Sequence, residues 1–168
     1  MKVRNKIGFG GGCHWCTEAV FQSLRGVEKV EQGYISSVSP NDSLSEGVIV
    51  HYNPTVISLE VLIEIHLYTH KSTSKHSMRD VYRSAVYYFE VDDSAFAKAC
   101  LSTFQSEFEK PIITQALPFE SFKASRQEIT DYYSKNPEKP FCKRYIAPKL
   151  QLLLRSFGKH YKNSSISS

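Results

Sequence analysis

A short stretch near the N-terminus, GFGGGCHWCTE at residues 8–18, holds the residue types most able to do chemistry. Residues 3–9 predict a strand, and residues 18–24, with three apolar positions on one helical face, predict a helix. The glycines between them allow a sharp turn, which puts Cys13 at or near the helix N-terminus. Unpaired N–H groups and the helix dipole at that end favour an anion. They lower the pKa of a thiol, so the pattern favours a nucleophilic Cys13 over an inert buried cysteine.

The length and composition fit a single domain. The chain has 168 residues, of which 41% are hydrophobic, enough for an ordinary core without disulfides. We expect the domain over residues 1–158 and a disordered, serine-rich tail over residues 159–168. The mild net charge of +4, spread along the chain, argues against nucleic-acid binding. No apolar run reaches about 18 residues and no signal-peptide pattern is found, so a cytoplasmic monomer without membrane contact is expected.

Four cysteines are expected to be reduced in that compartment: Cys13, Cys16, Cys100 and Cys142. In such a chain they serve catalysis or metal binding more often than structural bridges. Cys100 differs from the others, because it recurs with phenylalanines at helical spacing. That spacing predicts a core position for it.

The rest of the chain alternates strands and helices. Strands are expected over residues 27–38, 47–52, 84–91 and 112–122, and helices over 59–67, 94–108, 125–134 and 149–157. Ser58 is positioned to cap the helix that follows it. Residues 69–83 and 135–145 lack periodicity and are expected to be loops. Because the first six elements match a split βαβ arrangement, we predict an α+β, two-layer sandwich with a mixed sheet and a ferredoxin-like core.

Five short motifs, spaced along the chain in order, resemble those of one family. They are GCHW at 12–15, GY at 33–34, EGVIVHYNP at 46–54, YRSA at 82–85 and KNPEKPFC at 135–142. Over about residues 6–150, the chain is similar to the A class of peptide methionine sulfoxide reductases, which act on the S-sulfoxide. The chain departs from the family pattern at several positions, among them His14 for phenylalanine, Leu44 for histidine and Ser77 for aspartate.

The resemblance implies that Cys13, as a thiolate, attacks the sulfoxide sulfur, and that the oxygen leaves after gaining protons. Glu46 is the implied acid, since a carboxyl in a partly buried pocket keeps its proton to higher pH. Tyr34 and Tyr82 are implied to donate phenolic hydrogen bonds to the same oxygen. The alternative for each tyrosine is an ordinary strand or core aromatic whose hydroxyl meets water.

The resemblance also gives the two residues after Cys13 a part in substrate binding. Trp15 would form a wall for the methyl group of the substrate, and His14 would complete that wall. A second interpretation makes His14 a charge partner that lowers the pKa of Cys13 further.

Attack would leave Cys13 as a sulfenic acid, which a second thiol converts to a disulfide with release of water. Cys142 lies in a proline-flanked loop that is expected to move, and its segment resembles the family's recycling region. Cys16 lies where helical Cβ atoms are about 5–6 Å apart, beyond the roughly 3.5–4.5 Å of a disulfide, so the first helical turn would have to fray. The loop slightly favours Cys142, while Cys16 stays an alternative and the two could relay. Thioredoxin or a similar dithiol would reduce the disulfide, without any metal or organic cofactor.

Two other functions fit parts of the pattern. A CxxC at a strand-to-helix junction, Cys13 to Cys16, is typical of a thiol–disulfide oxidoreductase. Against this, we find no counterpart of the proline that thioredoxin folds place before a later strand. A zinc-binding module would use Cys13, either His14 or Cys16, and Cys142, but zinc sites usually combine two close pairs of ligands and the chain has one.

Overall fold

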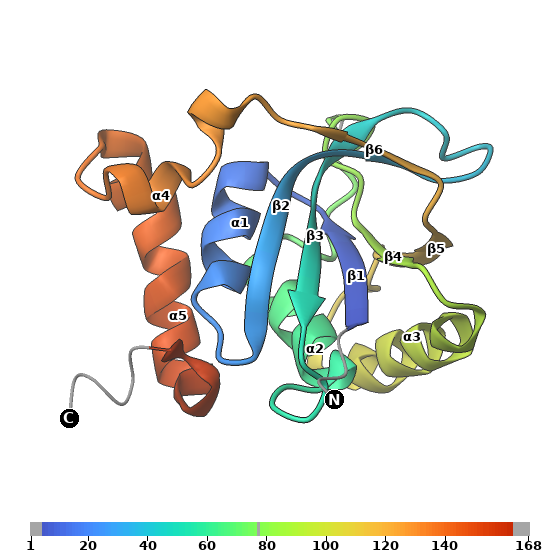
Figure 1. Cartoon of the computed structure of the whole chain (residues 1–168). Helices are drawn as coiled ribbons and strands as arrows, with labels where there is room; N and C mark the ends of the chain where they lie inside the picture. Colours follow the sequence, from blue (N-terminus) through green and yellow to red (C-terminus); the bar gives the residue numbers. More distant parts are fainter. Residues whose placement is uncertain (1–4, 77, 163–168) are drawn as a thin grey trace.

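The computed structural model describes residues 5–76 and 78–162 of the chain (Figure 1). The strands are β1 (Asn5–Gly10), β2 (Val27–Ser36), β3 (Ser45–Tyr52), β4 (Ala85–Tyr88), β5 (Gln115–Pro118) and β6 (Ser121–Ala124). The helices are α1 (His14–Gln22), α2 (Leu59–Thr69), α3 (Val91–Phe104), α4 (Tyr132–Lys135) and α5 (Ala147–Phe157). Short 3₁₀ or π turns occupy Gln105–Glu107, Gln127–Ile129, Cys142–Ile146 and Gly158–His160.

The six strands form one mixed sheet in the order β5-β4-β1-β3-β2-β6. β1 pairs antiparallel with β3 and β4, and β2 pairs antiparallel with β3, so β3 lies between the first two strands. β5 runs parallel to β4. The predicted α+β class and mixed sheet are confirmed. The ferredoxin-like description stays a prediction, because β5 and β6 extend the sheet at both edges.

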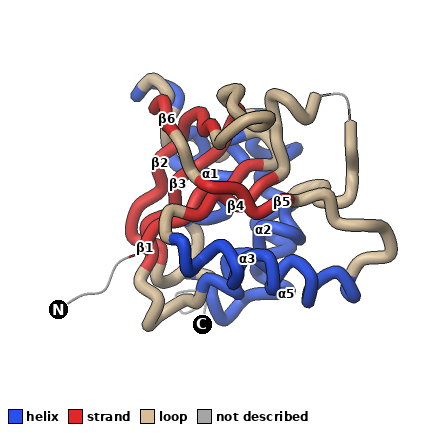
Figure 2. The backbone as a smooth tube through the Cα atoms, turned by 90° about the vertical axis from the view of Figure 1, so that its right-hand side faces the viewer, coloured by secondary structure: helices blue, strands red, loops and turns tan. Residues whose placement is uncertain are grey.

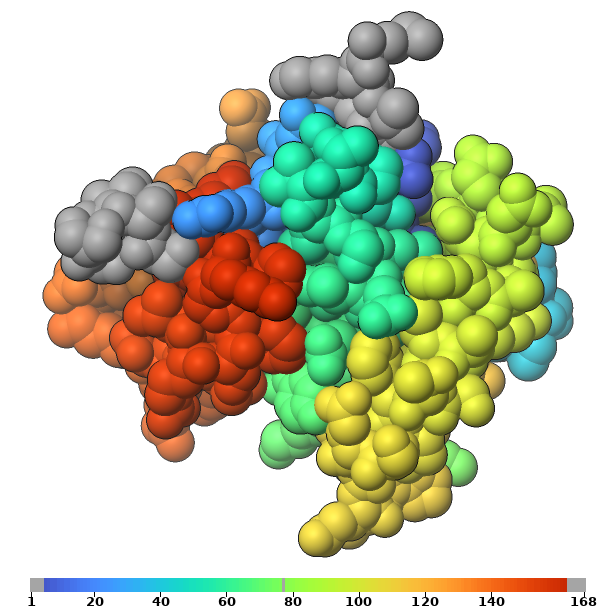
Figure 3. Space-filling model, turned by 90° about the horizontal axis from the view of Figure 1, so that it is seen from below, coloured from blue at the N-terminus to red at the C-terminus, as the bar shows by residue number. Residues whose placement is uncertain are grey.

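The helices lie on one face of the sheet and enclose the main core. α1 packs over β2 and β3, while α2, α3 and α5 lie side by side (Figures 2 and 3). Phe9 of β1 and Phe21 of α1 are fully buried between these layers, with their rings stacked at 4.6 Å. α2 begins as expected at Ser58, whose hydroxyl oxygen accepts the Val61 N–H at 3.2 Å.

The predicted single strand over residues 112–122 is wrong, because the structure has two short strands there. The chain runs beside β4 as β5, then turns and pairs with β2 as β6. Pro118 ends β5, which fits the inability of proline to continue a hydrogen-bonded ladder. On the face of the sheet opposite the helices, Phe119 and Phe122 cover a small apolar cluster that includes Ile35 and Tyr87.

Gly33 of β2 makes the contact with β6 possible. A Cβ atom at Gly33 would lie 2.3 Å from the carbonyl oxygen of Lys123, well inside any allowed contact. The absence of a side chain therefore lets β6 approach the strand that carries Tyr34.

The C-terminal part of the chain differs from the prediction in two places. Residues 125–134 contain only a 3₁₀ turn and the start of the short α4, not a continuous helix. Cys142, expected in a mobile loop, instead begins the helical turn that leads into α5, and its side chain is fully buried. The described part of the chain ends at Lys162, whose N–H donates to the Ser23 carbonyl at 2.7 Å. Residues 163–168 of the predicted tail lie outside the described residues.

Among the described residues, no helix is both long and apolar enough to cross a membrane.

Candidate active site

The turn between β1 and α1 forms as the glycines predict. Gly11 has a φ of +153°, and a Cβ atom there would lie 2.4 Å from the His70 ring. Cys13 is the N-cap residue of α1, and its carbonyl accepts the N–H groups of Cys16 and Thr17 at 3.1 and 3.2 Å. The thiol of Cys13 therefore stands at the helix N-terminus, half-buried.

The surroundings of Cys13 lower the pKa of its thiol. The largest cause is a hydrogen bond from the thiol of Cys16, and the backbone N–H groups of Trp15 and Cys16 act in the same direction. Burial and the charge of Glu46 raise the pKa and oppose this effect, but they do not outweigh it. Cys13 is thus a better nucleophile than an ordinary cysteine near neutral pH.

Glu46 lies in β3, directly beside the start of α1. Its Oε1 accepts the backbone N–H of His14 at 3.1 Å, and Nε2 of the His14 ring lies 3.5 Å from the same oxygen. The Glu46 side chain is 15% exposed, so the carboxyl is largely shielded from water. Because its charge acts on the Cys13 thiol, the carboxyl and the sulfur occupy the same region.

Two tyrosines lie in the same region as Cys13 and Glu46. Tyr34 is opposite Glu46 in the β2–β3 ladder. Tyr82 comes from the loop before β4, and its pKa is raised, first by the charge of Glu46 and then by burial, Cys13 and Tyr34. The structure therefore brings together Cys13, Glu46 and the two tyrosines singled out in the sequence.

A set of hydrogen bonds joins the Tyr82 loop to the beginning of β3. The carbonyl of Val81 accepts the Glu46 N–H at 2.8 Å and the hydroxyl of Ser45 at 2.8 Å. The Ser45 hydroxyl oxygen in turn accepts the Arg83 N–H at 2.7 Å. These bonds hold Tyr82 next to Glu46, a role for Ser45 that the sequence did not suggest.

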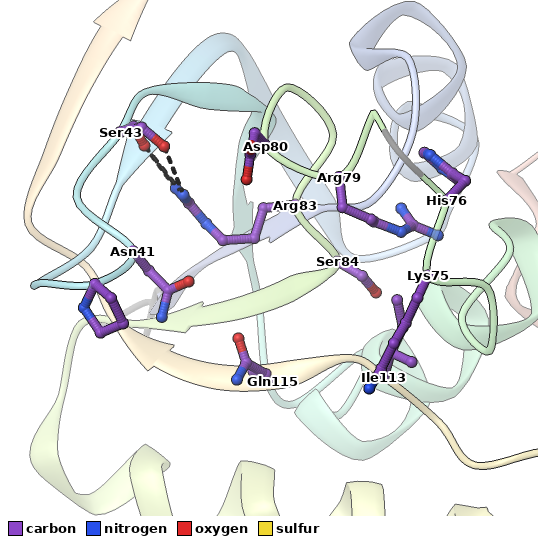
Figure 4. A pocket seen from close by; sticks show the side chains of 11 residues that line it. Asn41, Ser43, Lys75, His76, Arg79, Asp80, Arg83, Ser84, Ile113 and Gln115 are labelled. Atoms are coloured by element: carbon purple, nitrogen blue, oxygen red, sulfur yellow. Dashed lines mark hydrogen bonds between the residues drawn. The ribbon is translucent and has the colours of Figure 1, made fainter.

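Two arginines connect the loops around the site by donating hydrogen bonds to backbone carbonyls. Arg79 donates to the carbonyls of Gly11 and Tyr82, both at 2.8 Å, and so ties the glycine turn to the tyrosine loop. Arg83 donates to the carbonyl of Ser43 at 2.8 Å (Figure 4) and to the carbonyl of Ile35 at 3.1 Å. Both arginines also line a polar cavity of about 360 Å³ that does not include Cys13, shown in Figure 4.

A cavity of about 460 Å³ opens directly at Cys13. Its lining residues are Gly11, Gly12, Cys13, Cys16, His70, Lys71, His76, Met78, Tyr82, Phe141, Tyr145 and Lys149. Met78, Phe141 and Tyr145 supply apolar surface, while Tyr82 belongs both to this cavity and to the group around Glu46. Ser77, where the family has aspartate, lies outside the described residues.

Trp15 and His14 do not line this cavity. The Trp15 ring stacks on Tyr132 at 4.0 Å and meets the Phe141 ring edge-on at 5.4 Å, so the C-terminal segment covers it. His14 is buried, with ring Nδ1 3.1 Å from the Gly33 carbonyl oxygen and its ring edge-on to Tyr34. His14 thus contacts Glu46 and Trp15 contacts Phe141, but neither side chain reaches the cavity.

Cys16 and Cys142 lie close to each other in the core. Cys16 is buried, and its pKa is raised, first by the hydrogen bond that it donates to Cys13 and then by burial. The charge of Cys142 acts on Cys16 in the same direction. The Cys142 thiol donates to the Asn136 carbonyl at 3.4 Å. Cys16 is therefore the thiol in contact with Cys13.

A thiol of lowered pKa with a second thiol beside it can accept an oxygen atom and then release it as water. That chemistry defines the class of the protein as a thiol-dependent oxidoreductase. Residues 5–162 match the family model described as peptide methionine sulfoxide reductase, and the chain belongs to that family. It is an enzyme that reduces methionine sulfoxide to methionine, as the motifs predicted.

Related proteins agree with this assignment. A peptide methionine sulfoxide reductase MsrA of Deinococcus radiodurans is 35% identical over 89% of this chain and 81% of its own length. Mxr1 of Saccharomyces cerevisiae in its reduced form has the same fold, with a TM-score of 0.73 and 23% identity over 83% of this chain and 89% of that one. Mxr1 in complex with Trx2 gives a TM-score of 0.62 and 20% identity over 74% and 83% of the two chains. Within residues 5–76 and 78–162, no group of three or more His, Cys, Asp or Glu side chains could hold a metal ion.

Proposed function

We propose that Cys13 is the residue that takes the oxygen. Its thiolate attacks the sulfoxide sulfur, the oxygen passes to Cys13 as a sulfenic acid, and methionine leaves. Glu46 supplies the proton that the oxygen needs, and the hydroxyls of Tyr34 and Tyr82 donate hydrogen bonds to it as charge builds. The observation that carries this proposal is the position of Cys13 as the N-cap residue of α1, one residue before the His14 N–H that donates to Oε1 of Glu46 at 3.1 Å.

The apolar surface of the cavity is the proposed seat of the methionine side chain. Met78, Phe141 and Tyr145 face the space at Cys13 and would receive its methyl and methylene groups. Trp15 then contributes indirectly, by supporting the ring of Phe141. His14 contributes by holding the Glu46 carboxyl in place.

We propose that Cys16 resolves the sulfenic acid and that Cys142 follows it in a relay. The sequence slightly favoured Cys142, on the expectation of a mobile loop. Cys142 is instead fully buried in a helical turn, whereas the Cys16 thiol already contacts Cys13. The sulfenic acid and the Cys16 thiol form a disulfide and water. The Cys142 thiol can then exchange with that disulfide.

The last step of the proposal is reduction of the disulfide by thioredoxin or a similar dithiol. The solved complex of Mxr1 with Trx2 supports a thioredoxin for this chain as well. Because thiols carry every step, no prosthetic group is needed. All four cysteines are free, which fits a reducing compartment such as the cytoplasm, and we propose a monomer there.

Turnover of the two methionine sulfoxide epimers with dithiothreitol tests the proposal. We expect reduction of the S epimer by the parent protein and none by Cys13→Ser. Full activity in Cys13→Ser would disprove the assignment of Cys13. If the protein reduced insulin disulfides but neither epimer, the CxxC motif would mark a thiol–disulfide oxidoreductase instead.

A further inference from the structure

Lys149 is a partly buried cation beside the catalytic thiols. It lies in the first turn of α5, a helix that packs against both α1 and α2. Its ammonium group donates a hydrogen bond to the carbonyl of Thr69 at the end of α2. Its side chain lines the cavity that also contains Cys13 and Cys16. A buried ammonium group is costly unless it has a partner of opposite charge.

Within the described part of the chain, the two cysteines Cys13 and Cys16 are the negative partners of Lys149. Among residues 5–76 and 78–162, no carboxylate forms an ion pair with it. Burial lowers the pKa of Lys149 and the neighbouring charge of Lys71 does the same, while Cys16 and Cys13 raise it. The other titratable groups that line the same cavity are His70, Lys71, His76, Tyr82 and Tyr145. His66 is buried and His70 is partly buried, and both have lowered pKa values, chiefly through burial.

The charge at the two cysteines moves during the reaction. When Cys13 is the thiolate, Cys16 stays protonated because it donates its hydrogen bond to Cys13. Once Cys13 has become a neutral sulfenic acid, that hydrogen bond and that charge no longer hold the proton on Cys16. Burial and Cys142 still oppose ionisation of Cys16, and Lys149 is the neighbour that favours it.

We propose that Lys149 is a positioning residue for the second half of the reaction, in which it stabilises Cys16 as the thiolate that attacks the Cys13 sulfenic acid. The inference rests on the proposed function. In this step the S–S bond forms and the S–O bond of Cys13 breaks. The departing hydroxide combines with the proton released by Cys16, so water is the product and no outside reductant is consumed.

The test separates the two halves of the reaction in a single turnover. Reduced protein is mixed with methionine sulfoxide in the absence of a reductant. Methionine is measured in one quenched sample, and the sulfenic acid, trapped by dimedone, and the disulfide are measured by mass in another. Lys149→Gln keeps a donor for the Thr69 carbonyl but removes the charge, and Lys149→Arg keeps the charge. Lys71→Met removes the other lysine of the same cavity and is the matched control.

We expect Lys149→Gln to slow disulfide formation more than methionine release, so that sulfenic acid accumulates. A loss of about one pKa unit of stabilisation lowers the thiolate fraction about tenfold, and the greater nucleophilicity of a more basic thiol recovers about threefold of this. Disulfide formation should thus slow about threefold at neutral pH, with its pH midpoint about one unit higher. Lys149→Arg should restore the midpoint, and Lys71→Met should leave it unchanged.

Three outcomes would overturn the inference. They are a parent-like midpoint in Lys149→Gln, an equal shift in Lys71→Met, or an unchanged rate of disulfide formation in Cys16→Ser. Absence of a methionine burst in the parent protein would instead refute the proposed function. If Lys149→Gln unfolds below the assay temperature, an upward-shifted midpoint in the Arg variant would still contradict a role for charge.

Discussion

Oε1 of Glu46 accepts the backbone N–H of His14 at 3.1 Å, one residue beyond Cys13. The carboxyl is therefore fixed to the first turn of α1, beside the nucleophile at its N-cap. The same turn thus orients both the nucleophile and the proposed acid.

Replacement of Glu46 should act in opposite directions on the chemistry and on the thiol. Glu46→Gln keeps an acceptor for the His14 N–H but cannot deliver a proton, so methionine formation should fall about 10²–10⁴-fold. The charge of Glu46 raises the pKa of Cys13, so its removal should lower that pKa. Single-turnover methionine release and the pH dependence of Cys13 alkylation measure the two effects. A variant with full activity would exclude Glu46 as the acid.

The local part of this site could be predicted from sequence, because glycines and helical periodicity act over a few residues. They placed Cys13 at the beginning of α1 correctly. The pairing partners of β5 and β6 could not be predicted, since β4 and β2 lie far from them along the chain. An apparently continuous strand over residues 112–122 therefore proved to be two.

The same limit applies to the residues that support the site. Cys142 looked mobile from its flanking prolines, and only the packing of α5 on α1 shows that its side chain is enclosed. Lys149 carried no distinguishing local pattern, because its nearness to Cys16 arises from contact between α1 and α5. Ser45 became recognisable only through its bonds to Val81 and Arg83.

The hydrogen bond from Cys16 should control the acidity of Cys13. Its loss in Cys16→Ala destabilises the Cys13 thiolate, so the pKa of Cys13 should rise and its alkylation midpoint should move to higher pH. Cys16→Ser retains a hydroxyl donor and should shift the midpoint less. Iodoacetamide labelling across pH, followed by peptide mass mapping, measures Cys13 alone. Equal midpoints in the parent and Cys16→Ala would show that another group sets the acidity.

Tyr82 should contribute a transition-state hydrogen bond and not merely fill space. Tyr82→Phe keeps the ring but removes the hydroxyl near Glu46, and methionine formation should slow about 10²-fold. Tyr145→Phe is the matched control, because Tyr145 lines the same cavity without being grouped with Glu46. Rapid-quench assays of methionine release compare the two variants. Similar losses in both would indicate a general effect on the cavity.

The glycine turn offers a comparison of two adjacent positions. Gly11→Ala places a Cβ atom 2.4 Å from the His70 ring, at a φ of +153° that a side chain rarely adopts. The backbone strain alone should lower the free energy of unfolding by about 1–3 kcal/mol, and the shift of His70 should disturb the cavity at Cys13. Gly12→Ala meets no atom within 4 Å and should be close to neutral. Urea unfolding of both variants checks the difference. Equal stability of the two would mean that the turn does not need glycine at residue 11.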